Sequence, residues 1–267
     1  MKPSVNFDPA AETYEATRGF PPGVGLEVAS AAGELIGPVS RGKRILEVGI
    51  GTGRIGRPMA AIGLPVIGVD LSAKMMAELK RLVGADALAP TLVRGDGTRL
   101  PLADQTCAGV VGVHIFHLIP DWPAALAEIR RVLVPGGALL IGHDWRPDDS
   151  PNARLMEAWR DIARAAGAQT DHPGADGFYL VQDHLAAQGV SATEHFVGSW
   201  PVSRSVAQMV GGFERRSWSS TWHVPDEAFP GCLAELRTWA RTQLGEPETV
   251  LTTNHRFRWQ RFAFGAV

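Results

Sequence analysis

The sequence predicts an α/β protein with a mostly parallel, seven-stranded sheet and helices on both of its faces. Two observations predict this fold class. Apolar runs alternate with amphipathic segments over residues 44–143, as they do in consecutive βα units that build a parallel sheet. Residues 248–264 alternate apolar and polar side chains with a period of two, which is typical of one further strand. Because that strand needs a sheet to join, we expect a single domain over residues 1–267.

Five strands are predicted in the first half of the chain, each a short apolar run bounded by turn residues. In order, they are RILEVG, PVIGVD, TLVRGD, GVVGVH and ALLIGH. Helices are predicted at residues 72–83 and 122–133, because apolar side chains recur there at spacings of three and four. Pro135, Gly136 and Gly137 should end the second of these helices.

The segments outside this region are predicted to cap and complete the sheet. Residues 1–36 form a predicted N-terminal cap, and residues 44–145 form the core that binds the ligand. After residue 145 the sequence changes to loops, prolines and tryptophans, so residues 146–247 are interpreted as helical insertions and a substrate cap. Residues 180–200 are predicted to form a helix followed by a sixth strand, and residues 248–264 then form the closing, seventh strand.

The composition indicates a protein of the reducing cytoplasm that acts on a small molecule. Lys and Arg total 26 against 28 Asp and Glu, a formal charge of -2, so charge marks neither nucleic acid nor a membrane as the partner. Cys107 and Cys232 form no C-x-x-C pair, which argues against a disulfide framework and a metal site. No apolar run approaches the roughly 18 residues of a membrane span, and the N-terminus lacks the apolar core of a signal peptide.

The stretch ILEVGIGTGRIG, residues 45–56, contains two overlapping nucleotide-binding patterns. Gly49, Gly51 and Gly53 form G-x-G-x-G, whereas the register that ends at Gly56 fits the dinucleotide fingerprint G-x-G-x-x-G. Glycine is favoured in such a turn because the backbone approaches the ligand closely and can adopt positive φ angles. The glycines alone do not identify the ligand.

Ionisable residues at the predicted strand ends bear on this choice, because ligands of open α/β sheets bind outside the carboxyl ends of the strands. Strands two to five end in Asp70, Asp96, His114 and His143. Asp70 can accept both hydroxyls of a ribose in either kind of site. Glu47 is more informative, since a carboxylate just before the glycines is unfavourable beside a pyrophosphate but favourable beside an ammonium group.

Residues 44–143 resemble the class I S-adenosylmethionine-dependent methyltransferases, which have a Rossmann-like fold. The resemblance rests on ILEVGIGTGR, VIGVDLSAKMM, VRGDGTRLPL and HIFHLIPDWPAALAEIRRVLVPGGALLIG, which occur in the order and spacing of that family. It implies S-adenosylmethionine as cofactor and methyl transfer to a small-molecule acceptor. We therefore interpret the pattern that ends at Gly56 as a coincidence of register.

The resemblance also implies roles for single residues. The implied cofactor contacts are Glu47, Gly49, Gly51 and Gly53 at the methionine end, Asp70 at the ribose, Leu71 and Met75 beside the adenine and ribose, and Asp96 and Gly97 at the adenine edge. His114 is predicted to lie beside the cofactor as well. The stretch FDPAAETYEATRG resembles the family's segment that closes over the methionine moiety, which implies contacts from Tyr14 and Arg18.

Methyl transfer requires alignment and desolvation, and it requires a base only when the acceptor must lose a proton. His143 and His117 are the candidate bases, because they lie at or near strand ends where cofactor and acceptor should meet, and because histidine can titrate near neutral pH. The alternative for each is a structural, hydrogen-bonded histidine.

Aromatic residues are concentrated late in the chain. Trp200, Trp218 and Trp222 are predicted to line an apolar or aromatic acceptor pocket, and the alternative is that they pack the insertions onto the sheet. HRFRWQRFAF, residues 255–264, alternates basic and aromatic side chains as nucleic-acid-binding surfaces do. Its period of two fits a strand with one solvated face more simply.

Two other functions stay open at this point. A non-methylating protein or regulator would bind S-adenosylmethionine without consuming it. An NAD(P)-dependent oxidoreductase would use the second glycine register instead. The sequence also leaves open the acceptor, whether oxygen, nitrogen or carbon is methylated, and the oligomeric state.

Overall fold

A seven-stranded sheet forms the centre of the fold. The computed structural model describes residues 4, 7, 8, 11, 19–84, 87–168, 173–175 and 178–265. Within them the sheet has the strand order β3-β2-β1-β4-β5-β7-β6. Its strands are β1 (Arg44–Val48), β2 (Val66–Asp70), β3 (Thr91–Arg94), β4 (Cys107–Val113), β5 (Leu133–Trp145), β6 (Ala192–Ser205) and β7 (Val250–Ala263).

The strand pairings confirm the predicted, mostly parallel sheet. β1 pairs in parallel with β2 and β4, β2 pairs in parallel with β3, and β4 pairs in parallel with β5. The carboxyl ends of these five strands therefore meet at one edge of the sheet, where loops carry the functional residues of such folds. The predicted closing strand is observed as β7, which lies between β5 and β6.

Helices occupy the connections between the strands. They are α2 (Val24–Ile36), α3 (Gly56–Ala61), α4 (Ala73–Leu82), α5 (Trp122–Val132), α6 (Pro151–Ala165), α7 (Phe178–Ala186), α8 (Val206–Glu214) and α9 (Phe229–Leu244), with short 3-10 turns η2 (Phe116–Leu118) and η3 (Ser219–Thr221). α4 begins after Ser72, whose side chain accepts a hydrogen bond from the Met75 N–H, because an N-cap oxygen satisfies an otherwise unpaired donor. No helix among the described residues is long and apolar enough to cross a membrane.

One prediction about local structure was wrong. Pro135, Gly136 and Gly137 do not end a helix, since α5 is complete at Val132 and these residues lie inside β5. The reason is that Leu133 already has extended backbone and pairs with Cys107 of β4. Strand pairing, which the local sequence does not reveal, decides where the helix ends.

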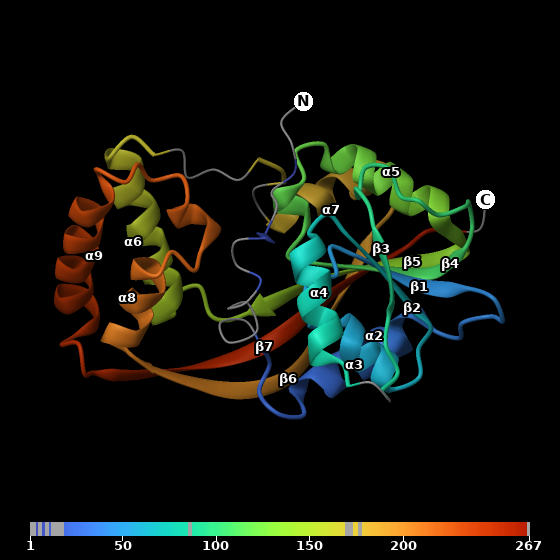
Figure 1. The fold of residues 1–267 in the computed structure, drawn as a ribbon, viewed down its shortest axis with the longest axis horizontal. Helices are drawn as coiled ribbons and strands as arrows, with labels where there is room; N and C mark the ends of the chain where they lie inside the picture. Colours follow the sequence, from blue (N-terminus) through green and yellow to red (C-terminus); the bar gives the residue numbers. More distant parts are fainter. Residues whose placement is uncertain are drawn as a thin grey trace. The chain divides into compact units, whose positions relative to one another are not determined.

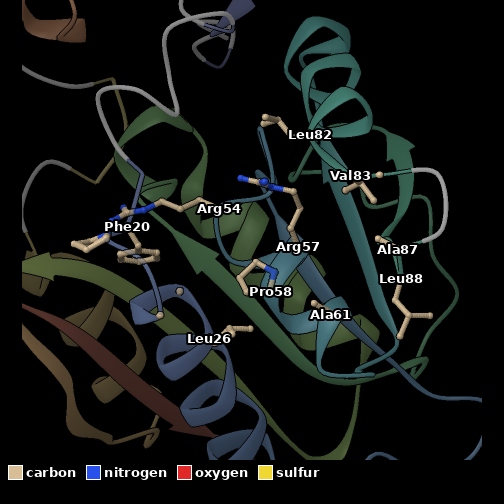
Figure 2. A pocket seen from close by; sticks show the side chains of 14 residues that line it. Phe20, Leu26, Arg54, Arg57, Pro58, Ala61, Leu82, Val83, Ala87 and Leu88 are labelled. Carbon is tan, nitrogen blue, oxygen red and sulfur yellow. The ribbon is translucent and has the colours of Figure 1, made fainter.

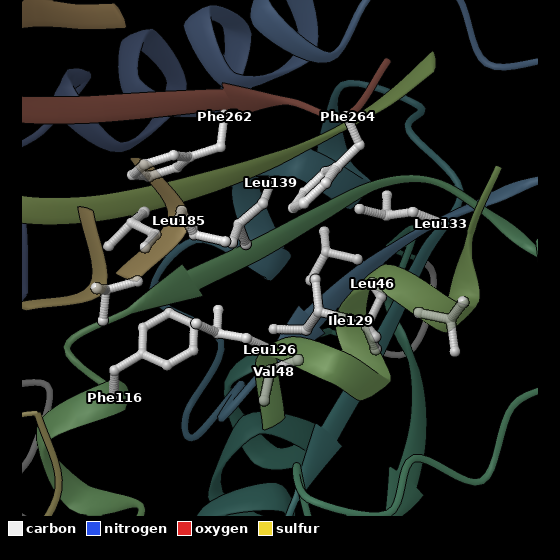
Figure 3. Close-up of a cluster of buried hydrophobic side chains, with 14 of the residues drawn as sticks. Leu46, Val48, Phe116, Leu126, Ile129, Leu133, Leu139, Leu185, Phe262 and Phe264 are labelled. Carbon is white, nitrogen blue, oxygen red and sulfur yellow. The ribbon is translucent and has the colours of Figure 1, made fainter. Parts of the chain in front are cut away.

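A single apolar cluster fixes the central strands in place. α5 and α7 lie on one face of the sheet, and α2 and α3 lie on the other (Figure 1). Figure 3 shows part of the cluster on the α5 face, where Leu46 of β1, Ile129 of α5 and Phe262 of β7 are completely buried. A close-packed core of this kind keeps the strand ends in a fixed geometry, and the loops that follow them are built on a rigid support.

The chain divides into two compact units. The first comprises Met1–His143, Pro173–Gly198 and Phe257–Val267. It contains the strand ends from β1 to β4 and the apolar cluster just described. Residues 173–198, which the sequence analysis assigned to the insertions, belong to this unit.

The second unit comprises Asp144–His172 and Ser199–Arg256 and has a core of its own. α6, α8 and α9 supply most of this core. The completely buried Trp159 lies at its centre, with ring centroids 5.2 Å from Phe213 and 5.9 Å from Phe229. Because aromatic side chains bury large apolar areas, this cluster accounts for several of the aromatic residues in the predicted insertions.

Candidate functional site

The loop after β1 requires glycine at two positions for two separate reasons. Gly49 and Gly53 have φ angles of 72° and 79°, in the left-handed region that other residues rarely adopt. A Cβ atom at Gly49 would lie 2.4 Å from Cδ1 of Ile115, and one at Gly53 would lie 2.6 Å from Cδ1 of Leu79. The loop backbone thus packs tightly against the segment after β4 and against α4. Gly51, between them, also has a positive φ of 54°.

Glu47, in β1, is buried beneath the start of α3 with 3% of its side chain exposed. A Cβ atom at Gly56 would lie 2.5 Å from Oε2 of Glu47, so the glycine that completes the overlapping pattern makes room for this carboxyl group. The pKa of Glu47 is raised well above its usual value, chiefly because the carboxyl group is buried. The charge of Asp70 raises this pKa further, whereas a hydrogen bond from the Gly56 N–H lowers it. Oε2 has no hydrogen-bond partner among the described residues.

Asp70 ties the end of β2 to the glycine loop. The Gly51 N–H donates to Oδ2 at 2.8 Å, and the Ser72 N–H donates to Oδ1 at 2.7 Å, so the carboxylate is held from both sides. Burial raises the pKa of Asp70, these two N–H groups lower it, and the nearby Asp8 carboxylate raises it again. The structure therefore brings the buried carboxyl group of Glu47 and the half-buried one of Asp70 to neighbouring strand ends.

The turn after β3 is built around Asp96. Its Oδ1 accepts hydrogen bonds from both the N–H and the hydroxyl of Thr98, each at 2.9 Å. Gly97 faces β1, because a Cβ atom there would lie 3.1 Å from Cγ1 of Val48. Asp96 thus lies at the predicted edge, but part of its acceptor capacity is used within its own turn.

Leu71 and Met75 follow Asp70 at the start of α4. The Leu71 carbonyl accepts a hydrogen bond from Nε of Arg94 at 3.2 Å. Met75 is buried, and its Cε lies 3.1 Å from the place where a Cβ at Gly51 would stand. Met75 therefore lies beside the glycine loop, and the contacts of Leu71 and Met75 with the adenine and ribose stay predictions.

Two of the three candidate histidines meet at the same edge. His114 follows β4 with a φ of 51°, an unusual backbone angle for a residue other than glycine. Its ring meets that of His143 edge-on, with centroids 5.4 Å apart and planes at 87°. His117 lies in η2, where its carbonyl accepts the Gly174 N–H at 3.0 Å. A strained residue at a strand end is a common feature of functional sites.

The N-terminal stretch contributes a residue that the sequence analysis missed. Tyr14 and Arg18 lie outside the described residues, so their contacts with the cofactor stay predictions. Asp8, in the same FDPAAETYEATRG stretch, accepts a hydrogen bond from the Ser72 hydroxyl beside Asp70. Its only sequence signal was membership of a segment predicted to close over the cofactor, since it belongs to no periodic pattern.

Comparison with known proteins decides which family has this site. A family profile described as a methyltransferase domain matches residues 46–141, which run from β1 into β5 and include the glycine loop, Asp70 and Asp96. The chain belongs to the class I S-adenosylmethionine-dependent methyltransferases. The cofactor of this methyltransferase is S-adenosylmethionine, as the motifs around Gly51 predict.

Curated relatives agree with this assignment. The phosphatidylethanolamine N-methyltransferase of Cereibacter sphaeroides is 30% identical over 134 residues, which cover 49% of this chain and 66% of that protein. The demethylmenaquinone methyltransferase of Parafrankia sp. (strain EAN1pec) is 28% identical over 240 residues, which cover 79% of this chain and 86% of that protein. Four further methyltransferases are matched over 46 to 65% of their own length.

Solved structures confirm the fold. The YcgJ protein of Bacillus subtilis is 17% identical with a TM-score of 0.57, and the match covers 89% of this chain and 98% of that one. Phosphoethanolamine N-methyltransferase 2 of Haemonchus contortus, in complex with S-adenosylmethionine, is 19% identical with a TM-score of 0.53, covering 97% of this chain and 57% of that one. At these identities the likeness establishes the Rossmann-like fold of this methyltransferase.

The residues at the strand ends fit S-adenosylmethionine. The glycines let the loop adopt positive φ angles and pack closely against Ile115 and Leu79, which holds the loop in place at the edge where ligands of such sheets bind. Oε2 of Glu47, buried without a hydrogen-bond partner among the described residues, suits a cationic group such as the ammonium of the methionine moiety. The oriented carboxylate of Asp70 suits the hydroxyls of a ribose.

We expect cofactor binding to depend on pH through Glu47. Its pKa in the free protein is raised, so at a pH below that value the carboxyl is protonated, and binding an ammonium group must expel the proton. Affinity should therefore be highest above the raised pKa and should fall as pH decreases through it. Titration calorimetry with S-adenosylhomocysteine in buffers of different ionisation enthalpy measures both the affinity and the released proton.

Glu47→Gln is the matched test, since it keeps the shape of the side chain and removes the charge. It should weaken binding by roughly 1.5 to 3 kcal/mol, the value of a hydrogen bond to a charged group. The number of protons released on cofactor binding should fall to the number released by Asp70 alone, whose pKa is also raised. Unchanged affinity and unchanged proton release in Glu47→Gln would remove Glu47 from the cofactor site.

Proposed function

We propose that this methyltransferase methylates a small-molecule acceptor with an apolar or aromatic body. The observation that carries the proposal is the concentration of tryptophans after residue 145, where no cofactor motif occurs. Two relatives offer further support, because they are named for demethylmenaquinone and phosphatidylethanolamine, and both molecules contain long apolar groups.

The chain's own residues have three tasks in this reaction. S-adenosylmethionine supplies an electrophilic methyl group when it is bound. Glu47, Asp70 and the glycine loop hold and orient the cofactor, and the apolar walls around them exclude water. We assign the proton acceptor to an imidazole nitrogen of His143, for acceptors that must lose a proton, and the edge-on ring of His114 would keep His143 in position. His117 is the second candidate base.

We further propose that residues after 145 select the acceptor, whereas residues 44–143 bind the cofactor. Among the three tryptophans, Trp200 is 8% exposed on β6, with its ring centroid 6.3 Å from that of His255. Burial lowers the pKa of His255, as does Arg146, which favours the neutral ring beside Trp200. An apolar surface with a neutral imidazole suits an aromatic or apolar acceptor.

Trp218 and Trp222 already have packing contacts in the second unit. The Trp222 indole N–H donates to the Arg216 carbonyl at 2.8 Å, and the Trp218 ring lies 6.5 Å from that of Phe213. These contacts fit the alternative in which both residues serve the packing of this unit. Trp200 is therefore the tryptophan for which we expect the clearest effect on the acceptor.

The proposal predicts a separation between acceptor turnover and cofactor affinity. Alanine at Trp200, Trp218 or Trp222 should impair turnover at one or more of these positions and leave S-adenosylhomocysteine affinity nearly unchanged. Turnover is measured as S-adenosylhomocysteine formed with a panel of phenols, amines and carboxylic acids that have apolar bodies. Trp239→Ala is a matched control, since this partly buried tryptophan on α9 packs against the core of the second unit and contacts Arg154 of α6.

Two results would contradict the division of roles. In the first, all three variants remain folded and keep normal turnover with every acceptor that the wild-type protein uses. In the second, each variant loses cofactor and acceptor binding together. A third result would contradict methyl transfer itself. If the protein binds S-adenosylmethionine but consumes none with any acceptor, it is a non-methylating binder or regulator.

We also propose that the reaction takes place in the cytoplasm. Cys107 and Cys232, the two cysteines of the chain, are both buried and not joined by a disulfide. Proteins that keep their thiols reduced are typical of that compartment.

A further inference from the structure

The loop between β3 and β4 contains two of the predicted cofactor contacts. It runs from Gly95 to Thr106 and includes Asp96 and Gly97. Its first residue is fixed to the neighbouring strand, because the Gly95 N–H donates to the Asp70 carbonyl at 3.0 Å. The position of the Asp96 carboxylate therefore depends on how the remainder of this loop is held.

Helix α5 holds the part of the loop that follows the Asp96 turn. The Leu100 N–H donates to Oε2 of Glu128 at 2.8 Å, and the Leu100 carbonyl accepts a hydrogen bond from Nη2 of Arg131 at 3.1 Å. Nη1 of Arg131 donates to the Leu102 carbonyl at 2.8 Å and to Oδ1 of Asp104 at 2.7 Å. Two side chains of one helix thus bind the loop at three successive points.

Glu128 and Arg131 also bind each other. Nε of Arg131 donates to Oε1 of Glu128 at 2.7 Å, and Nη2 donates to Oε2 at 2.8 Å, so every N–H group of the guanidinium has an acceptor. Hydrogen bonding by Arg131 holds the pKa of Glu128 below its usual value, which keeps the carboxylate ionised at neutral pH. A bidentate pair within a network holds its geometry better than an isolated surface ion pair.

The helix that carries this pair is a rigid support. Leu126 and Ile129 of α5 are buried in the apolar cluster, as Figure 3 shows. The side chain of Leu100 is buried in the same cluster, so the loop is held by packing as well as by hydrogen bonds. A loop that is ordered before its ligand arrives loses less conformational entropy on binding, and its polar groups stay close to the required geometry.

We propose that Glu128 and Arg131 are positioning residues for the cofactor, which hold the β3–β4 loop so that Asp96 recognises the amino group of the adenine. Oδ1 of Asp96 is engaged by Thr98, which leaves Oδ2 for this amino group. A carboxylate oxygen accepts a hydrogen bond from an amino group and is repelled by a carbonyl oxygen. The proposal rests on the expected place of Asp96 at the adenine edge, and it does not depend on the acceptor.

The probes are S-adenosylhomocysteine and S-inosylhomocysteine, in which a carbonyl oxygen replaces the amino group of the adenine. Both are titrated into the full chain by calorimetry. The wild-type protein should prefer S-adenosylhomocysteine by at least about tenfold. Arg131→Leu should weaken S-adenosylhomocysteine binding by about tenfold and leave S-inosylhomocysteine binding nearly unchanged, as should Asp96→Ala. General loosening of the fold would weaken both ligands alike.

Two milder variants test the same pair. Arg131→Lys keeps the charge, but an ammonium group cannot reach the acceptors that the planar guanidinium joins. Glu128→Gln keeps an acceptor for the Leu100 N–H but removes the charge that Arg131 binds. Each should lose part of the preference for S-adenosylhomocysteine.

Arg81→Leu is the matched control. Arg81 forms the same kind of pair with Glu78 on α4, three residues apart, through hydrogen bonds of 2.8 and 2.6 Å. It lies beside Leu82, a residue in the wall of the pocket that Figure 2 shows, and none of the described residues that line this pocket is assigned to the cofactor. Arg81→Leu should therefore keep both the affinity and the preference of the wild-type protein.

The proposal is overturned if folded Arg131→Leu keeps the wild-type preference or weakens both ligands equally. If this variant does not fold, the same two outcomes in Arg131→Lys overturn it. A wild-type protein without a preference, or an Arg81→Leu variant that loses it, also contradicts the proposal. None of these measurements requires an acceptor, so their failure is distinguishable from failure of the proposed reaction.

Discussion

His143→Gln should lower the turnover of an acceptor that must lose a proton by roughly 10² to 10⁴, the usual contribution of a general base. The reason is geometric, because His143 lies near the end of β5, which continues to Trp145, and its ring contacts that of His114, which follows β4. Glutamine keeps a hydrogen-bonding side chain but cannot accept the proton. S-adenosylhomocysteine affinity should stay unchanged.

A second acceptor separates a catalytic role from a structural one. An acceptor that is already ionised at the assay pH needs no base, so its turnover should be unaffected by His143→Gln. His195→Gln is the control for replacing a histidine that has no proposed catalytic role. The ring of His195, on β6, is hydrogen-bonded to the Thr193 hydroxyl. If His117→Gln produces the loss and His143→Gln does not, the base is His117. If both acceptors slow equally, His143 is structural.

Asp70→Ala should weaken cofactor binding more than Asp96→Ala. A carboxylate that accepts two hydroxyl hydrogen bonds contributes roughly 1.5 to 3 kcal/mol for each. Asp96 should matter less, because its Oδ1 already accepts two hydrogen bonds from Thr98. Titration calorimetry of both variants with S-adenosylhomocysteine gives the comparison.

Asp70 also holds the glycine loop, so the free energy of unfolding must be measured beside the affinity. Its bonds to the N–H groups of Gly51 and Ser72 are lost in Asp70→Ala, which should destabilise the free protein as well. Ser72→Ala removes the N-cap bond of α4 and the contact with Asp8 but keeps Asp70, and it serves as the control for local stability. Unchanged cofactor affinity in Asp70→Ala would show that β2 does not present the ribose site.

The sequence by itself determined the features that depend on short stretches of chain. Short apolar runs predicted the strands, and apolar side chains spaced three and four residues apart predicted α4 and α5. Such patterns are local because backbone geometry repeats over a few residues. The order of the motifs placed Gly51, Asp70 and Asp96 after successive parallel strands. Since such strands end at one edge of a sheet, the candidate cofactor site followed from chain order alone.

Only the tertiary structure decided which distant residues touch. His114 and His143 are separated by most of α5 and β5, and their contact arises because β4 and β5 pair in register. The same pairing ends α5 at Val132 and places Pro135, Gly136 and Gly137 inside β5, where the local sequence predicts a turn. Gly56 illustrates the point most clearly, since its sequence pattern suggested a dinucleotide whereas its structural role is to make room for Glu47.

The separate core around Trp159 also required the folded chain. Its side chains come from helices far apart in sequence, and no period or motif relates them. A local sequence pattern shows which face of a helix or strand is apolar. It does not show which other helix or strand will pack against that face. That choice is made by the packing of whole elements against one another, where contacts between distant residues offset the entropy lost in ordering the chain.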